Sequence, residues 1–275
     1  MMTFVVLCLI ALASGIVGAL VGLGGGVVLV PATIFYGITL GFMPEMTPQK
    51  VVGLSVVMMV FTGLSSTISY MKSKLVDFKA GWIFFIGSIP GAILGANLNK
   101  AFDLSSFQLF FGFLLIFLGT LLLIRDKLKP VTWFVLHGKK TTYIDVNGQH
   151  FEYGYPISVA IVLSFIVGTI SGLFGIGGGS MIVPAMVVLF LFPPHVAVAT
   201  SMFLVFLTSL VNSASHIYLG NVEWAYVLPI VIGAYIGAKI GAAINKKIQS
   251  DKVVIALRIV LLLMGVRSVI ESFMQ

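Results

Sequence analysis

The stretch Gly22-Leu-Gly-Gly-Gly-Val-Val-Leu-Val-Pro31 returns in the second half of the chain as Gly175-Ile-Gly-Gly-Gly-Ser-Met-Ile-Val-Pro184. Further matches follow each copy, after one insertion in the first half between residues 41 and 48. They pair Ser55 with Ser201, Thr62 with Thr208, Gly87 with Gly233, Gly91 with Gly237 and Asn99 with Asn245. Matches over most of a chain indicate an internal duplication. We therefore expect two repeats, residues 1–125 and 156–275, joined by a linker at 126–155.

The composition around these stretches is strongly apolar. Of the 275 residues 59% are hydrophobic and only 9% are charged, and the mean hydropathy is +1.13. In a soluble domain about a quarter of all residues are charged, so the composition excludes a soluble enzyme and a disordered chain. The cations lie in short loops, which excludes a nucleic-acid binder. The single cysteine, Cys8, excludes a disulfide framework and a Cys-based metal site, and we expect no cofactor. The sequence predicts an all-α polytopic membrane protein.

Each half contains five apolar segments, and the odd number predicts that the second half enters the membrane from the opposite side, as an inverted repeat. The segments lie near 3–22, 26–41, 50–71, 79–98 and 105–124, then 156–174, 179–192, 196–219, 223–244 and 252–272. Lys and Arg concentrate in cytoplasmic loops. With the N-terminus outside, the outer loops carry only Lys50 and Lys100, whereas the inner loops carry Lys72, Lys74, Lys79, Arg125, Lys127, Lys129, Lys139, Lys140, Lys246, Lys247 and Lys252.

The linker is the only sizeable polar stretch. Its residues 141–153 alternate polar and apolar around Asn147-Gly148, which is the strongest short signal for a β-hairpin. We expect a small cytoplasmic hairpin between the halves, acting either as a spacer or as a regulatory module.

The glycine stretches carry the densest chemistry, at Gly24, Gly25, Gly26, Gly177, Gly178 and Gly179. Glycine weakens a helix, and a broken backbone at membrane depth survives only where it lines a cavity or is buried in protein. We expect 8 to 10 membrane helices, with segments 1–2 and 6–7 broken or re-entrant. Successive N–H groups and the following helix dipole would attract an anion. The structural alternative is a tight turn or close helix packing; two equivalent breaks favour an anion site, with positive φ at Gly25 and Gly178.

A polar stripe follows one face of segment 3 and of segment 8. Its members are Ser55, Thr62, Ser66 and Ser69 in the first half and Ser201, Thr208, Asn212 and Ser215 in the second. The spacing of 7, 4 and 3 residues is the same in both, so each set shares a helical face. Such groups either replace part of an ion's hydration shell or join helices. His216 beside Ser215 is a candidate gate or proton site.

Acidic residues are absent from the middle of every apolar segment. Cation transporters keep carboxylates near the membrane midplane, so this absence disfavours a cation substrate.

These motifs resemble the TauE/SafE-type sulfite exporters. The resemblance is carried by the paired glycine stretches with Pro31 and Pro184, by Ala199-Thr200-Ser201, and by the run from Asn212 through His216 to Gly220-Asn-Val-Glu-Trp224. It implies a multi-pass bacterial plasma-membrane transporter of sulfur-containing anions such as sulfite, thiosulfate, sulfonates or sulfoacetate. It also implies that the six central glycines, Thr200, Ser201 and Asn212 serve the site. The first half departs from the second in having Leu54 opposite Thr200 and Tyr70 opposite His216.

The sequence thus predicts a secondary transporter that works by alternating access. Its expected partners are a small anion, membrane lipid and a coupling proton, and no nucleic acid; the oligomeric state is left open. The alternatives are an anion channel and a transporter of another small organic anion. A membrane enzyme is disfavoured because the apolar segments contain no nucleophile-base pair or metal cluster.

Overall fold

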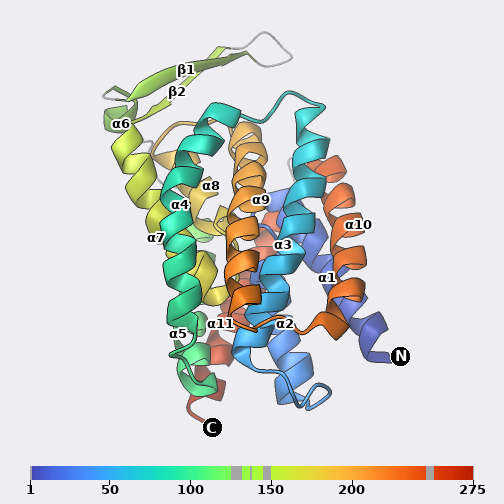
Figure 1. Ribbon diagram of the computed structural model, residues 1–275. Coiled ribbons are helices and arrows are strands. Elements are labelled where there is room, and N and C mark those ends of the chain that lie inside the picture. The colour runs from blue at the N-terminus through green and yellow to red at the C-terminus, as the bar shows by residue number, and fades with distance from the viewer. Residues whose placement is uncertain (1, 125–131, 137, 145–149, 246–250, 275) are drawn as a thin grey trace.

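The computed structural model is a bundle of helices with a two-stranded sheet at one end (Figure 1). It describes residues 2–124, 132–136, 138–144, 150–245 and 251–274. The elements of the first half and the linker are α1 (Met2–Val21), α2 (Gly26–Thr33), the π-helix η1 (Ile34–Thr39), α3 (Pro48–Met71), α4 (Phe78–Asn99), α5 (Leu104–Ile124), α6 (Thr132–Leu136), β1 (Lys139–Ile144) and β2 (His150–Tyr155). Those of the second half are α7 (Ile157–Phe174), α8 (Gly179–Val188), α9 (Pro194–Tyr218), the 3₁₀ turn η3 (Trp224–Tyr226), α10 (Val227–Asn245) and α11 (Asp251–Ser272).

Seven helical stretches of the described chain are long and apolar enough to span a membrane. They are α1, α3, α4, α5, α7, α9 and the stretch Trp224–Asn245. Two shorter apolar helical stretches, Gly26–Thr39 and Gly179–Val188, directly follow the glycine breaks. At 10 residues α8 rises about 15 Å, half of a hydrocarbon core of about 30 Å. The all-α polytopic membrane fold is therefore confirmed.

Several helices begin at the polar residues that favour an N-cap. Thr47 accepts a hydrogen bond from the N–H of Lys50 at 3.3 Å, and Asp77 accepts one from the N–H of Ala80 at 3.0 Å. Asp103 accepts one from the N–H of Ser106 at 2.8 Å. Each bond satisfies an N–H that a helix start leaves without a partner. These three loops therefore end where the sequence supplies a side-chain oxygen.

Helix contacts relate the two halves by a pseudo-two-fold axis. α1 packs on α10 and α4 packs on α7, and these two contacts interchange when α1–α5 are exchanged with α7–α11. α3 packs on α9 and α5 on α11, contacts that such an exchange leaves in place. α3 and α9 run antiparallel, because Gly53 near the start of α3 lies against Asn221 after α9, while Gly63 lies against Phe206. An antiparallel pair on the axis requires an axis perpendicular to the helices, which is the geometry of an inverted repeat.

Glycine ridges allow the pairs on either side of the axis to pack backbone to backbone. A Cβ atom added at Gly91 of α4 would lie 2.2 Å from the carbonyl oxygen of Phe165 in α7. The equivalent Gly237 of α10 has the same 2.2 Å approach to Leu12 O of α1. Small residues at intervals of four permit such contacts in membranes.

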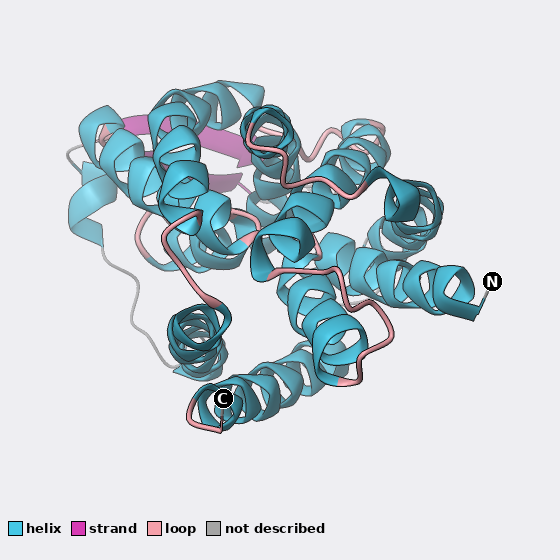
Figure 2. Cartoon of the chain, turned by 60° about the horizontal axis from the view of Figure 1, so that its bottom comes forward, coloured by secondary structure: helices cyan, strands magenta, loops and turns pink. Residues whose placement is uncertain are grey.

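The centre of the bundle is formed by α3 and α9. Of their membrane-spanning stretches 78% of residues are buried, against 39% to 44% for the other five spans. Figure 2 looks toward the end that carries both termini, and the two strands lie behind the helices at the far end. The helices equivalent by the repeat surround this central pair.

The strands of the linker dock on the bundle through two tyrosines. β1 and β2 pair antiparallel from Lys139↔Tyr155 to Ile144↔His150, where the alternating pattern predicts them. Tyr153 and Tyr155 are buried, with ring centroids 4.1 Å and 5.9 Å from that of Phe192. The Tyr153 hydroxyl donates to Asp77 Oδ2 at 2.8 Å. Burial and the Asp77 charge raise the pKa of Tyr153, so this hydroxyl stays a donor.

Some sequence expectations lie outside the described residues. These are the turn at Asn147-Gly148 and the loop cations Arg125, Lys127, Lys129, Lys246 and Lys247. The division into residues 1–125, 126–155 and 156–275 stays a prediction.

Candidate functional site

Left-handed glycines build both breaks, but not all at equivalent positions. In the first break Gly22, Gly24 and Gly25 have φ of 82°, 83° and 92°. In the second, Gly175 and Gly177 have φ of 66° and 78°, whereas Gly178 has φ of −63°. The expectation of positive φ is therefore confirmed for Gly25 and wrong for Gly178. Gly22 and the equivalent Gly175 both turn the chain with positive φ, so the difference lies at the helix starts: Gly25 is a left-handed N-cap of α2, whereas the N-cap Gly178 already has the helical φ and ψ of α8.

The two breaks touch each other and run in opposite directions. A Cβ atom added at Gly26 would lie 2.0 Å from the Gly175 carbonyl oxygen. At the equivalent crossing, a Cβ atom added at Gly179 would lie 1.9 Å from the Gly22 carbonyl oxygen. No real Cβ comes that close, so both crossings require glycine.

The contact lies halfway along the central helix α3. Cβ atoms added at Gly24 and Gly177 would lie 3.2 Å and 2.7 Å from the sulfur of Met59, near the middle of Pro48–Met71. Met58 similarly approaches Gly25. Sequence reasoning missed both methionines because nothing distinguishes them from other apolar residues of the segment.

Two serines of the predicted stripe clasp the breaks across the halves. Ser55 of α3 donates to the Gly175 carbonyl at 2.6 Å, and Ser201 of α9 donates to the Gly22 carbonyl at 3.0 Å. Both serines are fully buried. The structure thus brings Ser55 and Ser201 to the six central glycines, in one interaction that the repeat makes twice.

A pair of asparagines forms equivalent bonds to the carbonyls two residues before Gly22 and Gly175. The amide of Asn99 donates to the Leu173 carbonyl at 2.7 Å, and that of Asn245 donates to the Leu20 carbonyl at 2.6 Å. Carbonyls at a helix end lack a partner within the helix. These two residues were not predicted as site residues, although their match across the repeat was a signal for them.

The helices that follow the breaks start with free donors. No acceptor among the described residues meets the N–H groups of Gly26 and Val27 in α2, or of Gly179 and Ser180 in α8. Free N–H groups and the positive ends of two helix dipoles thus lie beside the contact between the breaks. This geometry favours a bound anion.

Other members of the predicted set point elsewhere. Thr62, Ser69 and Ser215 donate to carbonyls of their own helices, those of Met58, Ser65 and Val211. Thr208 bonds to Ser88 of α4 at 3.0 Å, and Thr200 accepts from the N–H of Asp77 at 3.0 Å. These hydroxyls are engaged in helix packing or in a loop contact.

Ser66 and Asn212 are buried with hydrogen-bonding capacity left over. The Asn212 amide donates to Ser171 Oγ at 3.2 Å, but its carbonyl oxygen has no described partner, and neither has Ser66 Oγ. The adjacent Thr67 and Ser213 share this property. A buried polar atom without a partner costs about 1–3 kcal/mol, so these two equivalent positions are suited to water or substrate oxygens.

His216 is buried and uses both ring nitrogens. Nε2 lies 2.9 Å from the Gly172 carbonyl and Nδ1 lies 3.1 Å from the Asn221 amide nitrogen. A carbonyl only accepts, so Nε2 carries the hydrogen and Nδ1 accepts. Tyr70 makes the equivalent bond to the Ala19 carbonyl at 2.8 Å. Although the first half has tyrosine where the second has histidine, both side chains donate to equivalent backbone carbonyls.

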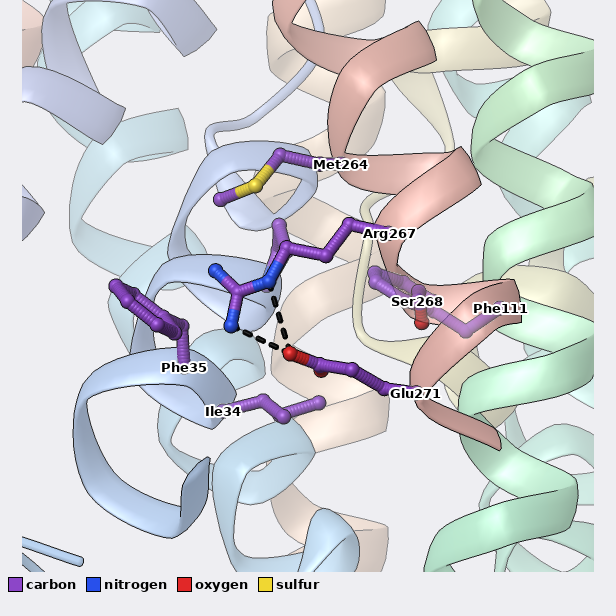
Figure 3. A pocket seen from close by; sticks show the side chains of 8 residues that line it. Ile34, Phe35, Phe111, Met264, Arg267, Ser268 and Glu271 are labelled. Carbon is purple, nitrogen blue, oxygen red and sulfur yellow. Dashed lines mark hydrogen bonds and ion pairs between the residues drawn. The ribbon is translucent and has the colours of Figure 1, made fainter. Parts of the chain in front are cut away.

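A second polar cluster anchors η1 to α11, away from the breaks (Figure 3). The Arg267 guanidinium lies 3.6 Å from the ring centroid of Phe35 and donates through Nε to Glu271 at 2.8 Å. The adjoining cavity has about 20 Å³, room for roughly one water. Because the two charges offset each other, this cluster is an anchor and not an anion site.

Comparison with known proteins identifies the family of the chain. The family model described as "Sulfite exporter TauE/SafE" matches residues 7–268. The chain is 47% identical over 271 residues to the probable membrane transporter protein YunE of Bacillus subtilis (strain 168), covering 98% of this chain and 99% of that protein. It is 27% identical over 231 residues to the probable membrane transporter protein YjnA of the same organism, covering 79% and 82%.

A plant protein matches over a shorter stretch. The sulfite exporter TauE/SafE family protein 6 of Arabidopsis thaliana is 34% identical over 87 residues, covering 31% of this chain and 20% of that protein. No solved structure matches the chain.

Proposed function

The chain belongs to the sulfite exporter TauE/SafE family of membrane transporters, and from this premise we propose that it moves a small sulfur-containing anion by alternating access. The substrate class comprises sulfite, thiosulfate, sulfonates and sulfoacetate. The membrane is the bacterial plasma membrane, with the N-terminus outside and the linker in the cytoplasm. The contact between the two glycine breaks, at mid-depth and on the repeat axis, carries this proposal.

The charge distribution around this contact supports an anion. The free N–H groups of α2 and α8 and two helix dipoles supply positive potential. The acidic residue nearest the middle of a described helix is Glu271, which lies in the last turn of α11 and pairs with Arg267. Sulfur oxyanions carry several oxygens, which suits several N–H and hydroxyl donors at once.

The two equivalent hydrogen bonds of Ser55 and Ser201 support alternating access. Ser55 holds the second break and Ser201 holds the first, so each central helix is bonded to the break of the other half. In an inverted repeat, exchange of the conformations of the halves exposes the same site to the other side. A channel needs a continuous pore, whereas here the backbones of the two breaks meet at Gly26 and Gly179 without space for a Cβ atom.

Glycine substitutions test the site directly. Gly178 has a helical φ, and an added Cβ there would lie 3.1 Å from Val167 Cγ1 alone. Gly178→Ala should therefore fold while placing a methyl group beside the donors of α8. Gly41→Ala is the control for a methyl group added away from the breaks, since no neighbour lies within 4 Å of an added Cβ there. Its φ of 74° lowers the stability of this variant without touching the donors of α8.

The measurement is the melting temperature of purified protein with sulfite, thiosulfate or sulfoacetate, beside sodium, ammonium and a neutral sugar. A ligand at 100 times its Kd stabilises by about 2.7 kcal/mol. We expect the anions to stabilise the wild type and Gly41→Ala, and Gly178→Ala to lose this effect. Stabilisation by a cation or sugar and by none of the anions would overturn the proposed substrate class.

A further inference from the structure

Two cavities of similar size lie at opposite ends of α3. One has about 340 Å³ and lies between the α3–α4 loop and the strands; its lining includes Lys74, Asp77, Lys79, Tyr143, Tyr153 and Val196. The other has about 350 Å³ and includes Glu45, Glu223, Ala225 and Tyr226. Glu223 pairs at 2.9 Å with Lys50, near the start of α3. The first cavity is therefore at the strand end, and the second is at the end that carries the termini (Figure 1).

The repeat makes the charges of these cavities directly comparable. Asp77 and Glu223 are equivalent, so both loops keep an acidic residue. Lys74 is equivalent to Gly220, and Lys79 is equivalent to Ala225. The strand-end cavity has thus gained two lysines where the other end has small neutral residues.

The backbone at Lys74 is in the conformation that suits its glycine counterpart. Lys74 has φ of 54° and Gly220 has φ of 71°. A side chain in this left-handed region costs energy that glycine does not. A strained non-glycine residue beside a cavity points to a use for its side chain, here a cation at the cavity wall.

Asp77 leaves the charge of these lysines available. Its Oδ1 accepts from the Ala80 N–H at the start of α4, and its Oδ2 accepts from the Tyr153 hydroxyl. Neither Lys74 nor Lys79 forms an ion pair with a described residue. The cavity therefore combines two ammonium groups that form no ion pair with a described residue, one Asp77 carboxylate and the N-terminal end of α4.

A short chain of contacts joins this cavity to the glycine breaks. The N–H of Asp77 donates to Thr200 Oγ1 at 3.0 Å. The next residue, Ser201, donates to the Gly22 carbonyl at 3.0 Å. An anion held at the cavity would thus lie at the end of α9 that leads to the breaks.

We propose that the strand-end cavity is a second anion site, a vestibule that collects the transported oxyanion before it reaches the breaks. This inference rests on the proposed function. The oxyanion lies between Lys74 and Lys79, and the organic part of a sulfonate lies against Tyr143 and Val196. The cavity at the other end, with Glu45 and Glu223, does not collect anions.

The substitution Lys74→Gly tests this vestibule without harming the fold. It removes the charge and supplies the residue that φ of 54° favours, so the melting temperature should not fall. Lys72→Gln is the matched control, because Lys72 is exposed on the same loop but does not line the cavity. The assay is sulfite uptake into proteoliposomes in which the full chain is oriented with the strand end outward, so that the vestibule faces the added sulfite. It is run at about 20 mM and about 500 mM inert salt, which screens surface charge.

We expect Lys74→Gly to raise the half-saturating sulfite concentration roughly fivefold at low salt, with the difference closing at high salt. Lys79→Gln should behave in the same way, and Lys72→Gln should change the value less than about twofold. Gly178→Ala, at the breaks, should lose transport at both salt concentrations.

The outcomes separate the two proposals. The vestibule is refuted, and the central site stands, in two cases in which the wild type transports sulfite. In the first, Lys74→Gly and Lys72→Gln have the same half-saturating sulfite concentration. In the second, the effect of Lys74→Gly on that concentration is the same at low and high salt. If the wild type neither binds nor transports any of the sulfur anions, both proposals fall.

Discussion

His216 and Tyr70 make the same hydrogen bond in their respective halves, but only an imidazole titrates near neutral pH. The sequence makes His216 a candidate gate or proton site. If it is the proton site, His216→Gln should keep a donor for Gly172 and remove the pH dependence of uptake between about pH 5 and pH 8. The measurement is the initial uptake rate in proteoliposomes across that range.

Tyr70→Phe is the control for this variant. It deletes the bond to Ala19 and should lower stability by about 1–3 kcal/mol, yet leave the pH profile in place. An unchanged profile in His216→Gln would exclude His216 as the proton site.

Asn212 carries a second residue-scale prediction. Asn212→Leu removes the donor to Ser171 and also the buried oxygen that has no partner. The two effects on stability oppose each other, so the free energy of unfolding should change by about 1 kcal/mol or less. Uptake should fall at least about tenfold, because one or two hydrogen bonds to a charged substrate are lost.

Ser66→Ala, at the equivalent position, removes one hydroxyl and should lower uptake less, since an amide offers more hydrogen bonds. Both variants are compared by uptake rate and by melting temperature. Full uptake by Asn212→Leu would assign this position to helix packing.

The sequence could predict part of the candidate site at this scale. Ser55 and Ser201 were found because the stripe and the repeat both mark them, and the structure bonds them to the breaks. Spacing alone cannot tell whether a hydroxyl meets a neighbouring helix or its own preceding turn, as Ser69 and Ser215 do. Met59 is an apolar residue in an apolar segment, so the sequence could not indicate its contact with both breaks, which depends on how the breaks pack together.

At the scale of the elements, the sequence predicts that both helices break at the glycine stretches, but not which glycines adopt positive φ. Both breaks contain four glycines in five residues, but the left-handed positions differ, because α8 starts from an N-cap in helical conformation, Gly178, whereas α2 starts from the left-handed Gly25. The π-helix Ile34–Thr39 was also unexpected. It follows Pro31, which lies inside α2 and lacks an N–H for the helix ladder.

The ridge between α4 and α7 carries the element-scale prediction. A Cβ atom at Gly87 would lie 2.2 Å from the Ile161 carbonyl and 2.3 Å from Ser164 Oγ. Gly87→Ala should therefore separate the helices and destabilise the protein by about 1–3 kcal/mol, while the sites of anion binding stay intact. The melting temperature should fall, and its rise on addition of sulfite should persist.

Gly220→Ala is the control for the ridge, since an added Cβ there meets nothing within 4 Å. It should lower stability only through its φ of 71°, by about 1–2 kcal/mol. A melting temperature of Gly87→Ala equal to that of the wild type would mean that α4 and α7 can shift apart at no cost.

At the scale of the whole molecule, the inverted repeat followed from an odd number of segments per half, and the antiparallel packing of α3 on α9 gives the same axis. The pairing of α1 with α10 and of α4 with α7 could not be predicted, because each half alone offers several apolar faces. Contacts within a bundle also do not say which end faces the cytoplasm. That assignment rests on the loop cations and stays a prediction.

Single cysteines in a Cys8→Ala background test this orientation. Ser73 is exposed on the α3–α4 loop, and Tyr218 is 89% exposed at the end of α9. Because neither side chain is buried inside the protein, labelling at these positions reports the side of the membrane on which each lies. The two loops are equivalent in the repeat and lie at opposite ends of α3, as the Lys50–Glu223 pair shows. With the N-terminus outside, Tyr218→Cys should react with an impermeant thiol reagent in intact cells, and Ser73→Cys should react only after permeabilisation. The reverse pattern would place the strands and their lysine-lined cavity outside the cell, and equal labelling of both in intact cells would contradict the inverted repeat itself.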